Sequence, residues 1–433
     1  MSIVTSADNG FGAFVARAHR AGKLVVQPRM GISAPEQMRA GLRATCDADG
    51  ATVGTLTVDS YTRVGDLEAA QLAVLDGVAL NGYPIVSHQH STTAEVLDSI
   101  AGPEFPVQVR HGSANPRDIF RAMTAVGLDA SEGGPASYCL PYGRVPLSES
   151  TRHWIRSCDE LVELRATGLE PHLESFGGCM LGQLCPPSEL VAISALEAMF
   201  FHYHGFRSIS ASYAQQTNPI QDAEAVRALQ RLCADHLPET DWHIVIYAYM
   251  GVYPSTRSGA YALLGTAARL AASTGCARLI VKTEAESVRI PTVAENVAAL
   301  EYAAAVADAT PRSVAEPGDS QTYREAAALV AAVMNLDADP GMAMLRAFER
   351  GYLDIPYCLH PDNRSLSRSY IDDRGYLCWA DIGRLPLSGM VDSSGPRTLS
   401  SSGLIESLTY VSRKFDQELG PVDTTPMPAV RGG

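Results

Sequence analysis

The sequence has few basic residues for its length. Its 433 residues carry 34 Lys and Arg against 48 Asp and Glu, which gives a formal net charge of −14 at pH 7. A protein that binds nucleic acid over an extended face needs a basic stripe, and this balance argues against one. An anionic ligand would therefore have to be bound by a few locally placed cations, working against the field of the whole molecule.

Paired cysteines and long apolar runs are also missing. The nine cysteines are scattered, with no C-x-x-C pair and no Cys/His cluster at zinc spacing, so we expect reduced, buried thiols and no metal site. The longest apolar stretches, such as 261–272, are broken by Gly, Thr and Arg and are too short to span a bilayer. Residues 1–14 lack the basic region and unbroken apolar run of a secretory signal. These absences predict a cytoplasmic protein.

Familiar motifs of nucleotide binding and hydrolysis are absent too. There is no Walker A loop, no G-x-G-x-x-G after a strand and no G-x-S-x-G elbow. His202 and His204, separated by one residue in an apolar setting, favour a core or helix-surface position over metal ligation. His111 follows an arginine directly, but no acidic residue at ligand spacing accompanies it, and its role stays open.

What the sequence does contain is an alternation of short apolar runs with Ala/Leu-rich helical segments such as 190–201, 222–233 and 293–307. The candidate strands are 24–26, 54–58, 83–86, 106–109, a run that ends at Ser131, 172–176, 208–211, 243–247 and 277–281. A (β/α)8 barrel needs eight strands, so one of these is an accessory strand or a wrong assignment. The alternation favours a barrel over an open sheet, although periodicity alone does not separate them.

Composition predicts how the chain is divided. We expect an N-terminal helical segment (1–20), a catalytic barrel (21–307), a linker containing Pro, Gly and acidic residues (308–320), a C-terminal accessory module (321–419) and a disordered tail rich in Pro and Gly (420–433). The predicted fold class is therefore α/β, a (β/α)8 TIM barrel with a C-terminal α+β accessory region.

Residues 106–142 are the most informative stretch for function. One apolar run there ends on Arg110, the next ends on Ser131 and Glu132, and Tyr138 and Tyr142 follow. Chemistry in parallel α/β folds lies at the carboxyl ends of the strands. A fixed cation, a carboxylate and two phenols at that place suit a small anionic substrate, but a buried Arg–Glu pair with two core tyrosines explains them equally well.

Three arginines share one property: Arg29, Arg63 and Arg110 each follow an apolar strand run. A guanidinium needs partners for five donors, so an arginine at such a position is costly unless it faces an anion. Three of them suggest a bidentate clamp for carboxylates. The alternative is a set of structural salt bridges to acids such as Asp59 and Glu132.

Two weaker signals lie elsewhere. Lys282 and Glu286 follow an apolar run at i,i+4 spacing, and spacing alone favours a helical salt bridge worth only about 0.2–0.5 kcal/mol. If the run is a barrel strand, however, Lys282 lies at the barrel mouth. Gly133 and Gly134 have no side chain, so the backbone there can approach a ligand closely.

Taken in order, these segments resemble the large (epsilon) subunit of glutamate mutase, also called methylaspartate mutase, from about residue 10 to about residue 390. The segments that carry the resemblance are QPRMG (27–31), GTLTVDSYTR (54–63), LNGYP (80–84), QVRHG (108–112), SEGG and SYCLPY (131–142), NPIQD (218–222), VKTEAE and IPT (281–292) and AFERGYLDIPY (347–357). The resemblance implies a (β/α)8 barrel that docks against a separate small (sigma) subunit carrying adenosylcobalamin, as a homodimer within a heterotetramer. It also implies a radical rearrangement of the carbon skeleton that interconverts (S)-glutamate and (2S,3S)-3-methylaspartate.

The same resemblance assigns roles to eight positions. Arg29, Arg63 and Arg110 correspond to the clamp on the substrate carboxylates, Glu132 meets the substrate ammonium, and Tyr138 and Tyr142 complete the substrate site. Lys282 and Glu286 correspond to the pair that holds the adenosyl ribose. Glu132 is also the candidate catalytic residue, because it can shuttle the ammonium proton. A rigid clamp in a closed barrel would keep a reactive radical aimed at one hydrogen.

Some segments depart from the family pattern. Loops at 88–90, 175–182, 212–218 and 247–259 look altered, and they would line the barrel mouth. The cobalt-ligating D-x-H-x-x-G motif of the small subunit is missing, since Asp241-Trp242-His243 lacks the glycine, so a partner must present the cobalamin. Two alternatives therefore remain: the same chemistry on a related amino diacid, or a catalytically silent barrel that acts as a binding partner.

Overall fold

The protein is represented by a computed structural model that describes residues 10–141, 143–178, 184–287, 289–313, 318–391 and 400–417. Some sequence predictions fall wholly or partly outside these residues. They are Tyr142, the disordered tail (420–433), and parts of the N-terminal segment (1–9), the altered loop (179–182), the linker (314–317) and the C-terminal module (392–399 and 418–419).

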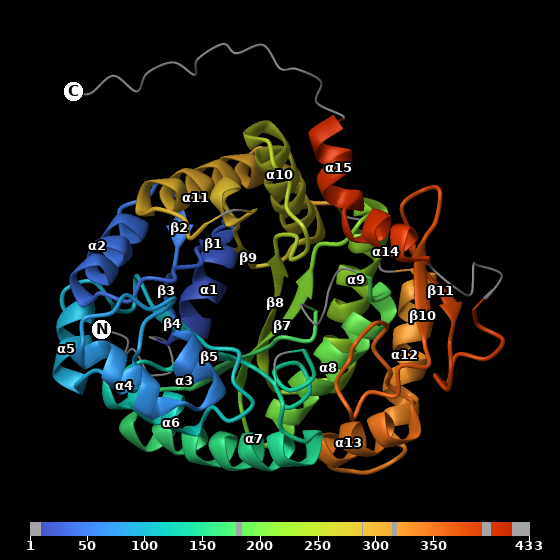
Figure 1. Cartoon of the computed structure of the whole chain (residues 1–433), viewed down its shortest axis with the longest axis horizontal. Helices are drawn as coiled ribbons and strands as arrows, with labels where there is room; N and C mark the ends of the chain where they lie inside the picture. The colour runs from blue at the N-terminus through green and yellow to red at the C-terminus, as the bar shows by residue number, and fades with distance from the viewer. Residues whose placement is uncertain are drawn as a thin grey trace.

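A parallel sheet rolled into a barrel forms the centre of the molecule (Figure 1). Its strands are β1 (Val25–Gln27), β2 (Ala51–Thr52), β3 (Gly54–Thr57), β4 (Val107–Arg110), β5 (Ala130–Gly133), β6 (His172–Ser175), β7 (Ser208–Ala214), β8 (Asp241–Tyr247) and β9 (Arg278–Ile280). The hydrogen-bonded order is β2-β1-β9-β8-β7-β6-β5-β4-β3. Only Val53 separates β2, which pairs with β1, from β3, which pairs with β4. Residues 51–57 thus fill one strand position in two halves and close the barrel, which confirms the predicted fold class.

Helices cover this barrel, most of them around its outside in chain order, whereas α1 (Phe11–Arg20) lies at the centre of the ring with Phe11 against the interior residues His172 and Arg278 (Figure 1). The others are α2 (Pro35–Cys46), α3 (Ser60–Val64), α4 (Leu67–Leu75), α5 (His90–Leu97), α6 (Arg117–Ala125), α7 (Leu147–Val162), η2 (Glu163–Thr167), α8 (Pro187–Tyr203), α9 (Pro219–His236), α10 (Arg257–Thr274), η3 (Glu284–Ser287) and α11 (Val293–Asp308). Within the residues described, no helix combines the length and the apolar character that crossing a bilayer requires.

One of the strands predicted from the sequence is wrong. Residues 83–86 contribute only an isolated bridge between Tyr83 and Val58, after which the chain turns. Pro84 has no N–H to donate to a ladder, and its carbonyl instead accepts turn hydrogen bonds from Ser87 and His88, both at 3.0 Å. The strand missed by the sequence reading is the two-residue β2, too short to leave a periodic pattern.

The C-terminal residues pack on one side of the barrel and contain both helices and strands. They form α12 (Gln321–Met334), α13 (Pro340–Arg350), the antiparallel pair β10 (Arg368–Ile371) and β11 (Leu377–Asp381), α14 (Ser401–Leu408) and α15 (Tyr410–Gln417). Helix α8 is buried on nearly every side because α12 and α13 cover the face that points away from the barrel. Where one folding unit ends and the next begins stays a prediction, since α12 and α13 share a continuous apolar core with the barrel helices.

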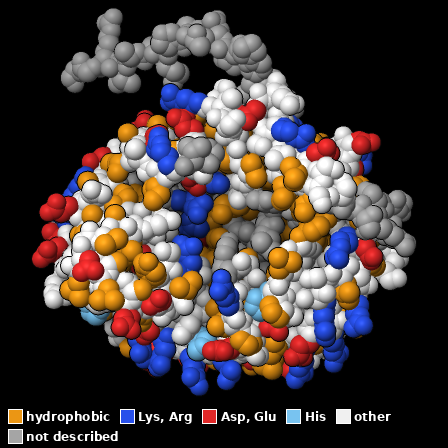
Figure 2. Space-filling model, in the orientation of Figure 1, with side chains coloured by type: hydrophobic (Ala, Val, Ile, Leu, Met, Phe, Trp, Pro, Cys, Tyr) orange, Lys and Arg blue, Asp and Glu red, His pale blue; other side chains and the backbone are white. Residues whose placement is uncertain are grey.

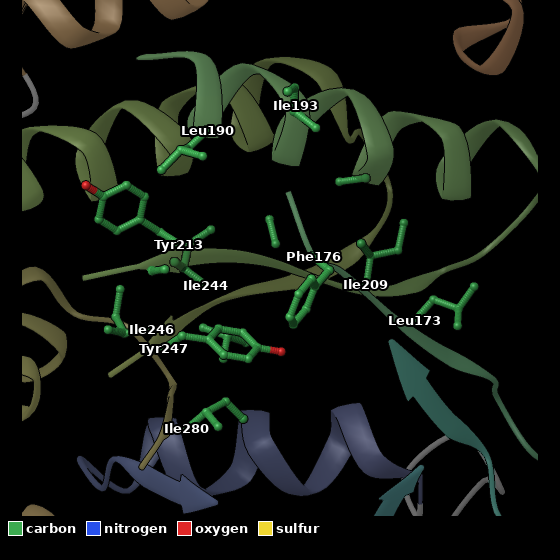
Figure 3. Packing of buried hydrophobic residues seen from close by; sticks show 14 of the residues in the cluster. Leu173, Phe176, Leu190, Ile193, Ile209, Tyr213, Ile244, Ile246, Tyr247 and Ile280 are labelled. Carbon is green, nitrogen blue, oxygen red and sulfur yellow. The ribbon is translucent and has the colours of Figure 1, made fainter. Parts of the chain in front are cut away.

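The core between the barrel strands and α8 consists of interdigitating apolar side chains (Figure 3). Leu190 and Ile193 of α8 face Ile209 and Tyr213 of β7 there. Burying one such side chain contributes roughly 1.5–3 kcal/mol. This packing fixes the strands, and the strands in turn fix the directions of the side chains at their ends.

Candidate active site

The three predicted arginines come together at the carboxyl ends of neighbouring strands. Arg29 follows β1, Arg63 lies in the short helix after β3, and Arg110 is the last residue of β4. All three line one cavity of about 110 Å³, together with Thr57, His111, Gly112, Glu132, Tyr138, Phe176 and Met250. Figure 2 shows the molecule in the same orientation as Figure 1, with Lys and Arg side chains gathered in a central hollow over the barrel. The three arginines and the carboxylate predicted from the sequence therefore line one cavity.

Glu132 is the most heavily bonded group in this cavity. Nε of Arg110 donates to its Oε2 at 2.7 Å, and the hydroxyl of Tyr247 donates to the same oxygen at 2.7 Å. The Tyr138 hydroxyl donates to Oε1. Burial opposes the charged form, but the charge of Arg110 and these hydrogen bonds outweigh it, so the pKa of Glu132 lies below its ordinary value. Glu132 is thus a carboxylate, and the salt-bridge alternative for Arg110 holds in part.

Arg63 differs from its two neighbours. Among the residues the structure describes, it makes no ion pair with a carboxylate, and its Nε is buried without a hydrogen-bond partner. Asp59, the acid suggested as a salt-bridge partner, instead caps helix α3 by accepting from the backbone N–H groups of Tyr61 and Thr62 at 2.9 and 3.0 Å. A buried guanidinium donor without an acceptor is costly. An anionic ligand would satisfy it.

Lys282 and Glu286 lie beside the arginine cavity. They follow β9, with Nζ of Lys282 3.9 Å from Oε2 of Glu286. The same carboxylate oxygen accepts from Nη1 of Arg29 at 3.1 Å. The Lys282 ammonium also lies 4.7 Å from the centre of the Tyr253 ring. Glu286 therefore connects the pair predicted for a cofactor with the arginines predicted for a substrate.

His111 lines the cavity, and its imidazole ring is uncharged. Burial, opposed in part by Glu132, lowers its pKa to about 4. Its Nδ1 accepts the backbone N–H of Ser113 at 3.0 Å, which leaves the proton of the neutral ring on Nε2. The ring meets Tyr138 edge-on, with centroids 5.0 Å apart. At neutral pH His111 adds a polar edge to the cavity but no charge.

The two glycines after Glu132 make room for side chains of the chain itself. A Cβ on Gly133 would lie 2.5 Å from the Tyr138 ring, and one on Gly134 would lie 2.1 Å from the Glu197 carboxyl group. Oε1 of Glu197, on α8, accepts the backbone N–H groups of Ala136 and Ser137 at 3.1 and 2.8 Å. These contacts anchor the segment that carries Tyr138 to the helix behind it. The close approach predicted for a ligand is made here by Glu197.

Glu197 also makes a pH-dependent contribution to stability. Burial raises its pKa from the ordinary 4.5 to about 7, so between these values the folded protein binds a proton that the unfolded chain releases. The stabilising contribution is complete below pH 4.5 and is lost as the pH rises through 7. We expect Glu197→Gln to gain up to about 3 kcal/mol relative to the wild type between pH 5 and pH 8. Urea unfolding of both proteins at the two pH values measures this, and a stability difference that does not change with pH would contradict it.

We did not predict from the sequence a polar network that lies inside the barrel, beside and below Glu132. It consists of Gln27, Gln108, Glu174, Ser210, Tyr247 and Arg278. The sequence does contain a signal for this network, because Glu174 and Arg278 are charged residues within the strands His172–Ser175 and Arg278–Ile280. Such a residue on a barrel strand faces either the interior or the helices, and in both directions it needs a buried partner.

Fold and site together define a class of protein: a (β/α)8 barrel with a cavity of arginines and carboxylates at the carboxyl ends of its strands, the place where barrel enzymes carry their active sites. The sequence profile described as "Methylaspartate mutase E chain (MutE)" matches residues 6–408. The chain belongs to the methylaspartate mutase E chain family.

Curated relatives agree with this assignment. The chain is 31% identical over 365 residues to the "Glutamate mutase epsilon subunit" of Halobacterium salinarum, covering 79% of this chain and 74% of that protein. It is 29% identical over 397 residues to the subunit of the same name in Desulfitobacterium hafniense, covering 87% and 81%. The structure of a geranylgeranylglyceryl phosphate synthase from Thermoplasma acidophilum covers 68% of this chain and 98% of its own, at 14% identity and a TM-score of 0.34. The relatives identify the chain as a glutamate mutase subunit, and the name epsilon implies that a further subunit completes the enzyme.

Proposed function

We propose that the chain is the large catalytic subunit of an adenosylcobalamin-dependent glutamate mutase, which converts (S)-glutamate to (2S,3S)-3-methylaspartate. The observation that carries the proposal is the arginine cavity, in which Arg63 has a buried donor without a partner next to the paired Arg110 and Glu132. Among the described residues at the cavity, Arg29, Arg63 and Arg110 face Glu132 and Glu286, which leaves one positive charge in excess. A ligand with two carboxylates and one ammonium group matches that excess.

Each group of the cavity has a definite task in this account. The guanidinium of Arg63 binds a substrate carboxylate through two parallel hydrogen bonds, with Arg29 and Arg110 completing the clamp. Glu132, held as a carboxylate, accepts a hydrogen bond from the substrate ammonium and stabilises its positive charge. Tyr138, Phe176 and Met250 wall the cavity and exclude water from the reacting atoms. The proposed role of Tyr142 is carried over from the family pattern alone.

The residues after β9 fit the adenosyl part of the cofactor. Lys282 and Glu286 provide a hydrogen-bond donor and an acceptor for ribose hydroxyls, and Oγ1 of the adjacent Thr283 is buried without a partner within the described chain. The chemistry supplied by bound adenosylcobalamin is a carbon-centred radical. Because Glu286 also contacts Arg29, the ribose would lie against the substrate clamp. Because the sequence lacks the cobalt-ligating D-x-H-x-x-G motif of the family's small subunit, we propose that a small sigma subunit presents the cobalamin.

The direct test combines the chain with a small subunit, adenosylcobalamin and (S)-glutamate, and follows 3-methylaspartate by NMR. We expect methylaspartate to form only when all four components are present. The control replaces the chain with the Desulfitobacterium hafniense relative, which establishes that the small subunit is competent. Product with the control but none with this chain would contradict glutamate as the substrate, and a series of related amino diacids would then separate a different substrate from a silent barrel.

A further inference from the structure

Tyr247, the last residue of β8, contacts Glu132, Glu174 and Arg110 at the base of the cavity. Its hydroxyl donates to Oε2 of Glu132 at 2.7 Å and also contacts Oε1 of Glu174. The guanidinium of Arg110 lies over its ring, 5.0 Å from the centroid. The Phe176 ring meets the Tyr247 ring edge-on at 5.2 Å, and Figure 3 shows the two side by side inside the barrel. One phenol therefore contacts both members of the Arg110–Glu132 pair.

Below Tyr247 lies a fully buried ion pair. Nη2 of Arg278 donates to Oε2 of Glu174, and neither side chain has any exposed surface. Arg278 also donates to Gln108 at 3.2 Å and to Ser210 at 3.1 Å. These groups come from β4, β6, β7 and β9, so they connect strands on different sides of the barrel. These hydrogen bonds fix the relative position of Arg278 and Glu174. We call the buried Glu174–Arg278 pair the floor of the cavity.

The register of strands β5 and β6 places Glu174 of the floor beside Glu132 of the candidate site. Glu132 and Glu174 are paired residues on the neighbouring strands β5 and β6, so both carboxylates point into the barrel at the same level. Tyr247 bridges them from β8. Its single phenolic hydrogen can be donated to only one carboxylate at a time. The hydroxyl oxygen lies between the two carboxylates, so its contact with Glu174 fixes the point from which it donates to Glu132.

We propose that Tyr247 is a positioning residue for Glu132, anchored by the buried Glu174–Arg278 pair. This inference deepens the proposed function and rests on it, because Glu132 is the group that would bind the substrate ammonium. Without the hydroxyl, Glu132 keeps Arg110 and Tyr138 as partners but loses its connection to the floor. The carboxylate can then rotate away from the ammonium, and it is less well stabilised as an anion.

Charged and titratable groups reach this network from several strands. Glu132 faces Arg110 on β4, His111 and Arg63 beyond it, Tyr138 in the segment after β5 and Tyr247 on β8. Glu174 faces Arg278 on β9, and the buried rings of His172 and His243 lie on the far side of that arginine. Burial lowers the pKa of both histidines well below the ordinary value, so they stay uncharged across the working pH range. Glu132 is therefore the group whose ionisation the Tyr247 hydroxyl favours directly.

Tyr247→Phe tests the inference, with Tyr213→Phe as the matched control. Tyr213 also donates a buried phenolic hydroxyl to a carboxylate, Asp222, at 2.8 Å, but it lies against the helices beside Leu190 (Figure 3). Both variants lose one oxygen and keep the ring, including its contact with Arg110 in the case of Tyr247. Thermal unfolding first establishes that the two variants are folded to a similar degree.

For Tyr247→Phe we expect kcat for glutamate to fall roughly ten- to hundredfold, the size of one hydrogen bond to a charged group. KM should change far less, because the arginine clamp is intact. The acid limb of the kcat/KM profile should move to higher pH, since the Glu132 carboxylate loses a donor that favours its charged form. Tyr213→Phe should show neither change. A purely structural role would lower activity in both variants in proportion to stability and leave the pH profile in place.

Three outcomes are decisive. A Tyr247→Phe protein with wild-type kcat and an unmoved pH profile overturns the inference and leaves the proposed function standing. Equal effects in the two phenylalanine variants also overturn it. A wild-type chain that neither turns over glutamate with a competent small subunit nor binds it in calorimetry overturns the proposed function, and the inference falls with it.

Discussion

Replacing Arg63 with lysine is expected to lower kcat/KM for glutamate on the order of a hundred- to a thousandfold, while the barrel stays folded. Arg63 is the guanidinium in the cavity that has no ion pair within the described chain, so its donors are available to a ligand. Lysine keeps the charge but presents a single point in place of a planar fork, and it cannot make two parallel hydrogen bonds to one carboxylate. Steady-state kinetics of the reconstituted enzyme measure the fall in kcat/KM, and thermal unfolding of the isolated chain shows whether the barrel stays folded.

Arg121→Lys is the matched control for that experiment. Arg121 is a largely exposed arginine of α6, where it pairs with Glu160 at 3.1 Å. The same chemical change should leave both kinetics and stability within error there, because surface ion pairs contribute little. If Arg63→Lys behaved like Arg121→Lys in the kinetic assay, Arg63 would not bind the substrate.

Glu174→Gln is expected to cost about 3–5 kcal/mol of folding free energy, the largest stability effect we predict for a single substitution. The change leaves the Arg278 guanidinium buried with no opposing charge, in a position with no exposed surface. A further substitution of Arg278 by methionine should recover part of the loss, because it removes the uncompensated charge. Urea unfolding of the wild type, the two single variants and the double variant completes the cycle.

The surface ion pairs that Glu160 makes with Arg117 and Arg121 provide the comparison for this loss of folding free energy. Glu160 is about one-third exposed, so Glu160→Gln should cost less than about 1 kcal/mol. Additive effects of the Glu174 and Arg278 substitutions would contradict the claim that the two side chains form one unit. A loss at Glu174 no larger than that at Glu160 would contradict it as well.

The sequence predicted the architecture and the place of the site because both depend on local patterns. Apolar runs alternating with helical segments predict a parallel α/β fold and favour a barrel, and a charged residue directly after such a run lies at the strand end. Arg110 and Glu132 could therefore be placed at one rim before their contact was known. The wrong strand at residues 83–86 has the same origin, since its apolar letters resemble a strand and only Pro84 argues against pairing.

The network below the site could not be predicted in the same way. Tyr247, Glu174 and Arg278 are separated by 31 residues or more in sequence, and they meet only because β6, β8 and β9 curve around one axis. Each looks unremarkable within its own strand. The covering of α8 by α12 and α13 is equally invisible locally, although the lack of a polar face on α8 is a sequence signal for it.

The central claim is that Arg29, Arg63 and Arg110 together bind the two carboxylates of one small amino diacid. Titration calorimetry of the isolated chain with (S)-glutamate and with (S)-glutamine tests it most directly, because the two ligands differ only in one carboxylate. We predict that glutamate binds and that glutamine binds roughly a hundredfold more weakly, since a guanidinium is left without its anion. Equal affinity for the two ligands, or no binding of either, would contradict the account.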